Sequence, residues 1–246
     1  MEKRIVVDIN GVTMRFNMPK EKVDNIKEYL IKMLKHQLRF EEFTALSNVS
    51  LQVYAGEVVG IVGLNGSGKS TMLKLIAGII EPSEGSVTTE GSISPMIELG
   101  AGFDFELTAR ENIFLNCSVL GFSRDFVKEK YDEILDFAEL RDFENVAIKN
   151  FSSGMIARLG FAIATLVKPD ILIVDEILAV GDFLFQQKCE KRISELMNGG
   201  TTVLIVSHSI EQIERLCTRV VWLEHGVVKM DGTTPEVCEE YKKTER

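Results

Sequence analysis

The sequence predicts an α/β fold built on a parallel sheet with helices on both of its faces. Two near-continuous apolar runs, Ile171–Val174 and Thr202–Val206, have the length and composition of strands buried on both faces, and a helical pattern separates them. A glycine-rich segment between another apolar run and another helical pattern repeats the same alternation. Fully apolar strands that alternate with helices form a parallel sheet covered on both sides.

Length and composition favour a globular protein with a full hydrophobic core. The chain has 246 residues, of which 45% are hydrophobic and 26% charged, and this excludes disorder as its main state. We expect one domain spanning residues 1–246. The formal net charge of -9 argues against nucleic acid as the main ligand, because affinity for nucleic acid comes largely from basic residues on phosphates.

The cysteines and the apolar runs bear on the cellular compartment. The four cysteines have neither metal-ligand nor redox-motif spacing, so we expect four free thiols in a reducing environment. Asp8 interrupts the apolar stretch that a secretory leader needs, and the longest uncharged apolar run, Leu159–Val167, is far shorter than the roughly 20 residues of a membrane span. We expect a cytoplasmic protein that depends on other subunits for any membrane part.

The first elements are predicted to be strands, followed by the helix after the glycine-rich loop. A β-type run covers Ile5–Ile9, and a turn is expected at Asn10–Gly11. A second β region covers about 43–62. The helix that starts at Lys69 is expected to end near Gly78, because glycine is a common helix stop signal.

Residues 20–38 differ in character from their surroundings and predict an amphipathic helix. Residues 20–40 contain six Lys or Arg against three Asp or Glu, inside an acidic chain. Basic amphipathic helices suit anionic surfaces and partner grooves, so we expect this helix on the membrane-facing side. A solvated helix packed on its own domain remains an alternative. Its apolar positions recur at three- and four-residue steps: Val23, Ile26, Leu30 and Met33.

The remaining elements follow from glycine, proline and periodicity. Two glycine-punctuated β segments are expected within 86–107, and the pattern is helical over 108–145 and 153–167. At the end of the chain, 220–232 reads as a small hairpin with a turn at Glu224-His225-Gly226, followed by a short helix.

The strongest chemical signal is a segment that fits the phosphate-binding pattern G-x-x-x-x-G-K-[ST]. It follows the strand Val58–Val62 and opens a helix, and its glycines let the backbone wrap closely around phosphates. Lys69 would reach the β- and γ-phosphates, and Ser70 would hold Mg²⁺ with Thr71 next to it. The alternative is a glycine-rich turn that matches by chance. The segment consists of Gly63, Leu64, Asn65, Gly66, Ser67, Gly68, Lys69, Ser70 and Thr71.

Two carboxylates end the apolar strand Ile171–Val174, where open α/β sheets bind their ligands. Asp175 can hold Mg²⁺ directly or through water, and Glu176 can polarise a water that attacks a γ-phosphate. The alternative is an acidic pair that only marks the start of a helix.

Another candidate contact with phosphate precedes a helix at Phe151–Met155. The residues Ser152, Ser153 and Gly154 offer a hydroxyl and backbone amides at a helix N-terminus, which can face a γ-phosphate. An ordinary N-cap is the competing interpretation, since serine is among the commonest cap residues.

Three single residues are further candidates. His208 follows the strand Thr202–Val206 and can hydrogen-bond a γ-phosphate, although a lone histidine is more often structural. Asp182 lies just beyond the acidic pair and can also be a simple turn residue. Phe16 can stack on an adenine ring, although a phenylalanine here can also belong to the core.

The order of these motifs along the chain resembles the nucleotide-binding subunit of ABC transporters over nearly the whole sequence. The resemblance implies an α/β phosphate-loop NTPase of the ABC type, with a mixed sheet core, an antiparallel β subdomain and a helical subdomain over about 108–167. It also implies ATP hydrolysis with ATP and Mg²⁺ as cofactors. For the nucleotide, the resemblance implies that Phe16 stacks on the adenine ring, where Tyr is usual, and that Gly63–Thr71 bind the phosphates and Mg²⁺. It also implies that Asp175 belongs to the metal shell, that Glu176 is the catalytic base, and that His208 is the switch histidine, which contacts the γ-phosphate.

The resemblance also implies a homodimer that sandwiches ATP. In that arrangement Ser152 to Gly154 contact the ATP held by the other protomer, and Asp182 lies in a loop that meets the partner subunit.

Longer segments resemble the ATPase subunits that export O-antigen, teichoic acid and related cell-surface polysaccharides. The segments are Phe151–Met155, Asp175–Asp182 with Phe185–Cys189, and Glu98–Phe103 before Glu106–Asn112; the insertion 20–42 is also similar. The resemblance implies that the chain powers export of a lipid-linked polysaccharide through a separate, dimeric membrane permease, at the cytoplasmic face of the membrane.

One departure from the family pattern concerns the metal site. The glutamine that usually links Mg²⁺ to the membrane subunit should lie within 91–107, and this window contains none. Glu98 is the nearest polar candidate, and its carboxylate could still reach the metal or its water.

A soluble ABC-type ATPase with a non-transport role is the alternative function. Translation-type members normally carry two phosphate loops in one chain, whereas this chain has one. DNA-type members separate their halves by a long coiled coil, whereas the stretch between Lys69 and Asp175 holds only a compact helical pattern. We therefore expect the transport function.

Overall fold

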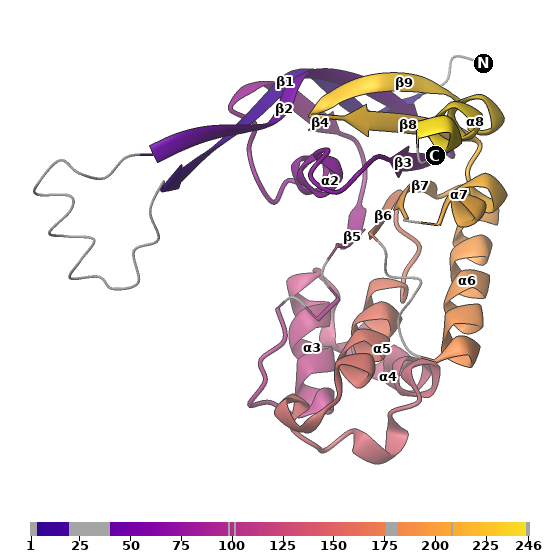
Figure 1. Ribbon diagram of the computed structural model, residues 1–246. Coiled ribbons are helices and arrows are strands. Elements are labelled where there is room, and N and C mark those ends of the chain that lie inside the picture. Colours follow the sequence, from indigo (N-terminus) through magenta and orange to yellow (C-terminus); the bar gives the residue numbers. More distant parts are fainter. Residues whose placement is uncertain are drawn as a thin grey trace, which may run out of the picture.

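The computed structural model describes residues 4–19, 40–97, 99–100, 102–175, 182–207 and 209–244, and two sheets organise this part of the chain (Figure 1). One sheet has three antiparallel strands in the order β2-β1-β4, and the other has six strands in the order β5-β6-β7-β3-β8-β9. The strands are β1 (Ile5–Pro19), β2 (Phe40–Tyr54), β3 (Val58–Val62), β4 (Glu84–Thr89), β5 (Ile93–Met96), β6 (Ile171–Asp175), β7 (Thr202–Val206), β8 (Arg219–Glu224) and β9 (Val227–Thr233).

Helices pack against both sheets and also form a separate group below them in Figure 1. They are α2 (Lys69–Ile76), α3 (Ala109–Val119), α4 (Arg124–Ala138), α5 (Ser153–Ala164), α6 (Phe183–Asn198), α7 (Ile210–Leu216) and α8 (Thr234–Thr244), with 3₁₀ turns at Arg141–Phe143 and Ile148–Asn150. None of the helices in the described ranges combines the length and the hydropathy that a bilayer span requires.

The six-stranded sheet is mixed, as expected. Strands β5, β6, β7, β3 and β8 run parallel, and β9 returns antiparallel beside β8. The turn between β8 and β9 lies at His225 and Gly226, both at positive φ, which confirms the predicted hairpin. The parallel core, the antiparallel sheet and the separate helices together confirm the predicted fold class.

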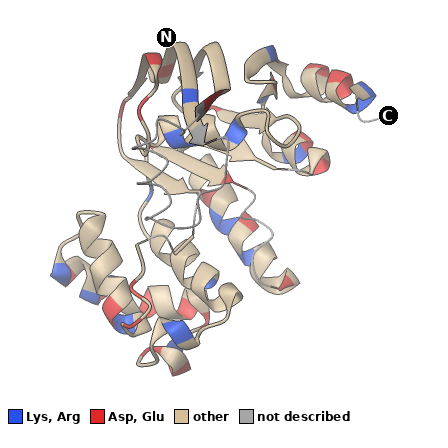
Figure 2. Ribbon diagram, turned by 60° about the vertical axis from the view of Figure 1, so that its left-hand side comes forward, with Lys and Arg blue, Asp and Glu red and all other residues tan. Residues whose placement is uncertain are grey.

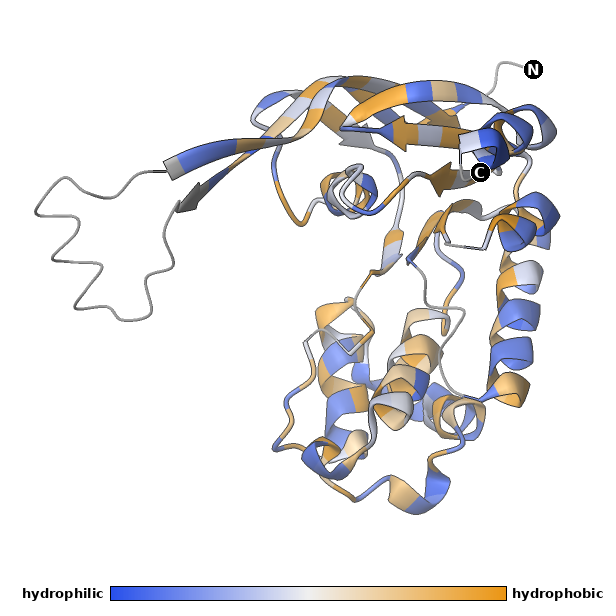
Figure 3. Ribbon diagram, in the orientation of Figure 1, coloured by the Kyte–Doolittle hydropathy of each residue, from blue (hydrophilic) through white to orange (hydrophobic). Residues whose placement is uncertain are grey.

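The apolar strands are buried on both faces, which explains their composition. Ile171 and Ile173 of β6 face a core shared with α2 and the antiparallel sheet. The alternate residues Leu172 and Val174 face a second core shared with α5, α6, α7 and α8. Because successive strand residues point to opposite faces, a strand covered on both sides must be apolar throughout. In Figure 3 the central strands are accordingly coloured as hydrophobic.

The lower helical group has a core of its own and is joined to the sheet through α5. Ile113 of α3, Leu135 of α4 and Leu159 of α5 are fully buried in this third core. Phe161 of α5 belongs instead to the core beneath the six-stranded sheet. Acidic and basic residues are interspersed along these helices (Figure 2), as expected for solvated amphipathic helices.

The predicted turn at Asn10–Gly11 is wrong. Strand β1 continues through it to Pro19 and stays paired with β2 from Ile5 opposite Tyr54 to Pro19 opposite Phe40. The register shifts at this point, Gly11 has a φ of 59°, and its N–H donates to the Ser50 hydroxyl rather than to the ladder. The Asn-Gly pair therefore forms a β-bulge, because β2 offers a partner on both sides of it.

The pairing of β1 with β2 also defines one boundary of the predicted insertion. Strand β2 begins at Phe40, so the last residues of the insertion expected over 20–42 are part of a strand. The amphipathic helix predicted over 20–38 lies outside the described residues.

The four cysteines are free, as expected from their spacing, and the structure buries all four. Burial raises the pKa of Cys189 to about 12 and that of Cys117 to about 11. These thiols therefore stay protonated at neutral pH and serve as small apolar side chains.

Candidate functional site

The register of the parallel strands brings two of the predicted motifs to one edge of the sheet. Asp175 at the end of β6 lies opposite Val206 of β7, and Val206 lies opposite Ile61 of β3. The glycine-rich loop starts at Gly63, immediately after β3. With strands about 4.8 Å apart, Asp175 and the start of the loop are separated by roughly 10 Å across the sheet. This is the edge at which open α/β sheets bind their ligands.

Two glycines of the loop are required by close backbone approaches. A Cβ at Gly63 would lie 2.2 Å from the carbonyl oxygen of Leu223. A Cβ at Gly68, whose φ is 104°, would lie 2.7 Å from the carbonyl oxygen of Ala45. The loop is therefore pressed between β8 and β2, and its shape depends on residues without side chains.

The hydroxyl of Ser67 indicates that the loop holds a ligand. This side chain is buried, and its Oγ is the buried side-chain polar atom that has no hydrogen-bond partner among the described residues. The Ser67 backbone is satisfied, because its N–H donates to Leu64 and its carbonyl oxygen accepts from Gly226. A buried hydroxyl without a partner costs free energy, and a bound group that accepts or donates there removes the cost.

Lys69 and the start of α2 add positive charge to the same loop. The Lys69 side chain is buried, and its ammonium donates to the carbonyl oxygens of Gly63 (2.7 Å) and Leu64 (3.1 Å). Helix α2 has neither a side-chain cap nor an acidic residue in its first turn. Its first N–H groups and the positive end of its dipole therefore remain available to an anion. These donors, together with the Ser67 hydroxyl, fit the phosphates of a nucleotide.

A hydroxyl and a carboxylate stand where a metal ion that accompanies phosphates would bind. Ser70 lies in the first turn of α2, and Asp175 lies at the end of β6. No group of three or more His, Cys, Asp or Glu is arranged for a metal ion within the ranges that the structure describes. Mg²⁺ fits such a site, since it is usually held by one or two protein oxygens plus phosphates and water. The candidates Glu98, Glu176 and His208 lie outside the described residues.

Phe16 lies on the hairpin arm that passes the loop. It is paired with Phe43 of β2, and it is half-buried against the core beneath the antiparallel sheet. Ala45, two residues further along β2, has its carbonyl oxygen against Gly68. Phe16 thus combines core packing with a position near the loop.

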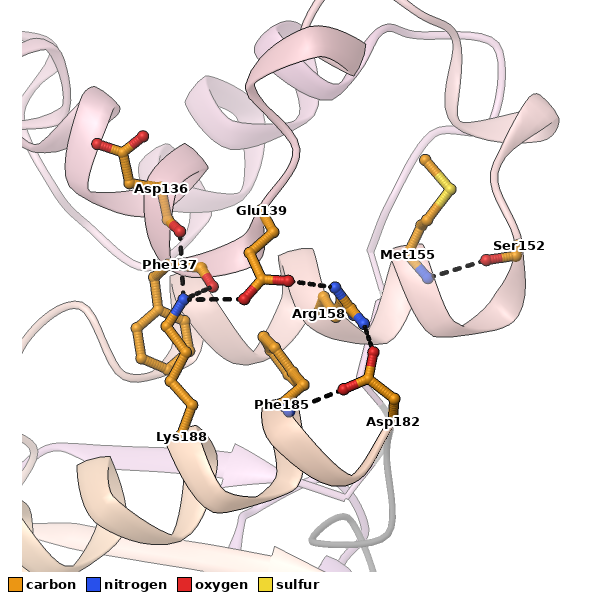
Figure 4. Close-up of polar contacts among 9 residues, drawn as sticks. All are labelled: Asp136, Phe137, Glu139, Ser152, Met155, Arg158, Asp182, Phe185 and Lys188. Atoms are coloured by element: carbon orange, nitrogen blue, oxygen red, sulfur yellow. Dashed lines mark hydrogen bonds and ion pairs between the residues drawn. The ribbon is translucent and has the colours of Figure 1, made fainter.

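The structure does not bring the Ser-Ser-Gly motif to the loop of the same chain. Ser152 caps α5, its Oγ accepting from the N–H of Met155 at 3.2 Å (Figure 4). Both Ser152 and Ser153 are exposed, and the first turn of α5 contains no acidic residue. Figure 1 shows α5 in the lower helical group, well apart from α2 beside the sheets. The N-terminus of α5 can therefore meet a phosphate held elsewhere.

Asp182 is part of a polar network between three helices (Figure 4). Its Oδ1 accepts from the N–H of Phe185 at 3.0 Å and so caps α6, and its Oδ2 pairs with the Arg158 guanidinium of α5 at 2.5 Å. The N–H of Phe185, and then the charge of Arg158, hold the pKa of Asp182 below its ordinary value. Asp182 is therefore ionised at neutral pH and is more than a turn residue.

Sequence reasoning did not single out two residues at these sites. Gly226 donates its N–H to the Ser67 carbonyl oxygen and accepts from the N–H of Ser47, so the β8–β9 turn joins the loop to β2. The turn was predictable, but its packing was not. Arg158 joins the cap of α6 to α5, and its signal in the sequence is that it is the one charged residue of α5.

Comparisons with known proteins agree with this geometry. Residues 46–179 match a family model described as ABC transporter. The chain is 43% identical to the O-antigen export system ATP-binding protein RfbB of Klebsiella pneumoniae, over 97% of this chain and 98% of that protein. It is 41% identical to the teichoic acids export ATP-binding protein TagH of Staphylococcus epidermidis, over 97% and 88%. A dimeric, post-hydrolysis structure of the ATP-binding cassette MJ0796 bound to ADP and Pi covers 93% of this chain and 98% of its own, with a TM-score of 0.74 and 26% identity.

Proposed function

This chain belongs to the ABC transporter family and is a Mg²⁺-dependent ATPase, and on that premise we propose that it powers export of a cell-surface polysaccharide through a separate membrane permease. The observation that carries this proposal is similarity over nearly the full length to ATP-binding proteins of O-antigen and teichoic acid export systems. Because the polymer would pass through the permease, which polysaccharide is moved depends on that partner.

The loop and the sheet edge would hold the nucleotide. The amides and glycines of Gly63–Thr71 bind the phosphates, with Lys69 contributing its charge and Ser67 its buried hydroxyl. Ser70 and Asp175 would hold Mg²⁺, with Glu98 as a further candidate. When bound, the metal neutralises charge on the phosphate oxygens. Phe16 would contact the adenine ring.

The residues that follow β6 and β7 in the sequence would carry the hydrolytic step. The Glu176 carboxylate accepts the proton of the attacking water, and His208 hydrogen-bonds the γ-phosphate. Support for these roles comes from their place in the chain, directly after Asp175 and two residues after Val206, at the sheet edge that carries the loop.

A second copy of the chain would complete each site. The N-terminus of α5, which is exposed and has no acidic residue in its first turn, would face the nucleotide held by the partner copy through Ser152, Ser153 and Gly154. Asp182 would lie near the same interface. Two observations support this arrangement: α5 lies apart from the loop of its own chain, and a structural relative is a dimer bound to ADP and Pi (Figure 1). A two-fold axis makes both sites equivalent.

The permease would contact the α3 side of the helical group, which would hold the chain at the cytoplasmic face of the membrane. Apolar side chains that expose 39% to 78% of their surface gather on α3 and directly after it: Leu115, Val119 and Leu120. A neighbouring cavity of about 730 Å³ between α3 and α4 has a net positive and partly apolar lining: Arg110, Glu111, Phe114, Leu115, Ser118, Arg124 and Lys128. Such a patch suits a partner segment with apolar and acidic side chains. The predicted helix 20–38 remains a second candidate contact.

Export in cells tests the proposal. Replacing the chain by its Glu176→Gln variant should abolish surface polysaccharide and leave polymer inside the cell. Val119→Asp should leave Mg-ATP hydrolysis of the purified protein unchanged but lower permease co-purification and export at least about tenfold, as for a residue central to an interface. Val167→Asp, at an exposed valine that follows α5 in the sequence, is the control. Normal surface polysaccharide in the Glu176→Gln cells would refute the export function.

A further inference from the structure

We infer that Arg158 is a positioning residue that holds the N-terminus of α6, at Asp182, against α5, the helix that begins with the Ser-Ser-Gly motif, so that both are presented to the second protomer as one surface. The inference rests on the proposed ATP sandwich and adds a residue to it. Arg158 itself lies six residues after Ser152, and its guanidinium pairs with Asp182 and Glu139.

The geometry of Arg158 is that of a two-sided clamp (Figure 4). Its side chain is only 18% exposed; Nη2 pairs with Asp182 at 2.5 Å and Nη1 pairs with Glu139 at 2.7 Å. Glu139 is the C-cap of α4 and has a φ of 60°. One guanidinium therefore joins α4, α5 and α6, which only its planar fork of donors allows.

Phe185 fixes the guanidinium from its other side. The Arg158 guanidinium lies over the Phe185 ring, 4.8 Å from its centre, and the N–H of Phe185 donates to Asp182. The ring also packs edge-on against Phe137 of α4 and Phe161 of α5. Any shift of Asp182 relative to α5 must therefore disturb both the ion pair and the ring contact.

The clamp contributes position more than stability. Both carboxylates are more than half exposed, so water screens their attraction to Arg158. The three helices have other connections: Lys188 of α6 donates to the Phe137 carbonyl oxygen of α4 at 2.8 Å, and the aromatic rings form a common core. Loss of Arg158 should leave the helices folded but free to shift where Asp182 and α5 meet.

The test compares Arg158→Met with Arg192→Met in the Glu176→Gln background, where the ATP-bound dimer should accumulate. Arg192 also lies against this cluster, 4.9 Å from the centre of the Phe137 ring and 3.5 Å from Glu133, and neither of these contacts involves Asp182. We expect Arg158→Met to raise the dissociation constant of the ATP-bound dimer about tenfold or more, which is the size of effect expected when an active-site group is misplaced. The ATP affinity of the monomer should stay within about twofold of the parent's. Arg192→Met should leave both values unchanged.

Two further variants separate positioning from folding. Asp182→Asn keeps the cap of α6 and loses the ion pair, so it should reproduce the defect of Arg158→Met, and the double variant should be no worse than either single one. In the otherwise native protein, Arg158→Met should lower kcat and leave KM for ATP nearly unchanged. Arg158→Lys should restore kcat only in part.

Each outcome has one meaning. If Arg158→Met keeps the dimer affinity and kcat of its parent, or loses them only in proportion to a lower Tm, Arg158 is not a positioning residue. If the Glu176→Gln parent itself forms no dimer with ATP, the sandwich fails, whatever Arg158 does.

Discussion

Single atoms of the phosphate loop show that it is built for a ligand rather than for its own stability. Ser67 leaves a buried hydroxyl without a partner in the described structure, and Lys69 satisfies its ammonium on carbonyl oxygens of the loop itself. A bound phosphate would supply oxygens that accept hydrogen bonds from the Ser67 hydroxyl and the Lys69 ammonium. The loop is therefore less stable when empty than it would be with a ligand, as is common for binding sites.

The first prediction follows from that hydroxyl. Ser67→Ala should raise the free energy of unfolding of the ATP-free protein by about 1 kcal/mol, because a buried polar group without a partner is removed. The same change should weaken ATP binding by about tenfold, through the loss of one hydrogen bond to a charged phosphate. Denaturant unfolding and nucleotide titration measure the two effects.

Ser118→Ala is the matched control, since the Ser118 hydroxyl is exposed and donates to the Phe114 carbonyl oxygen. It should change neither quantity appreciably. A Ser67→Ala protein that is less stable without ATP and binds ATP normally would show that the hydroxyl has a structural partner instead.

At the scale of elements, the β8–β9 turn supports the loop from outside the motif. Gly226 has a φ of 78°, and a Cβ there would lie 2.7 Å from the Ala45 carbonyl oxygen. Its N–H donates to the Ser67 carbonyl oxygen, and its own carbonyl oxygen accepts from the N–H of Ser47. The turn therefore connects the six-stranded sheet, the phosphate loop and the antiparallel sheet, so its conformation affects the position of the loop.

Gly226→Ala should therefore damage both folding and binding. We expect a loss of about 3 kcal/mol in the free energy of unfolding from backbone strain and the close contact, and weaker ATP binding in the fraction that stays folded. Gly121→Ala is the control, because Gly121 has a similar φ of 85° but open space around its Cβ position. It should cost only about 1 kcal/mol and leave ATP affinity intact. Equal effects of the two variants would contradict a supporting role for the turn.

At the scale of the whole molecule, the two segments that we propose to contact one nucleotide lie in different parts of the chain. The loop lies beside the sheets, and the N-terminus of α5 lies in the lower helical group (Figure 1). In the proposed head-to-tail pair, each α5 would face the other copy's nucleotide, so ATP would form part of the interface. Binding and hydrolysis would then close and open the pair and supply motion to the permease.

The mass of the purified protein tests this arrangement. Glu176→Gln should still bind Mg-ATP, lose hydrolysis by about two to four orders of magnitude, and shift from 27.6 kDa to twice that mass when Mg-ATP is added. Lys69→Ala should lose ATP binding and the mass shift together. Light scattering with and without Mg-ATP measures the change. If Glu176→Gln hydrolyses ATP at the parental rate, Glu176 is not the catalytic base. If the mass stays constant with ATP bound, the chain does not form the ATP-sandwich dimer.

Some features were determined by the sequence alone because they depend on neighbours in the chain. The glycine-rich loop between a strand and a helix needs only its own residues to be recognised, and the apolar strands show their double burial in their composition. The β8–β9 hairpin, the helix caps and the free cysteines are local in the same sense. The phosphate loop and the fold class were therefore predictable.

Other features were decided only by the tertiary structure, because they depend on which distant segment lies alongside. The Asn10–Gly11 pair is compatible with a turn and with a bulge, and the extended pairing with β2 selects the bulge. The clamp between Arg158 and Asp182 joins residues 24 positions apart on different helices, so neither residue reveals its partner in the sequence. Gly226 reaches the phosphate loop from the opposite end of the chain. Packing free energy sets such contacts, and packing is a property of the folded chain as a whole rather than of any segment.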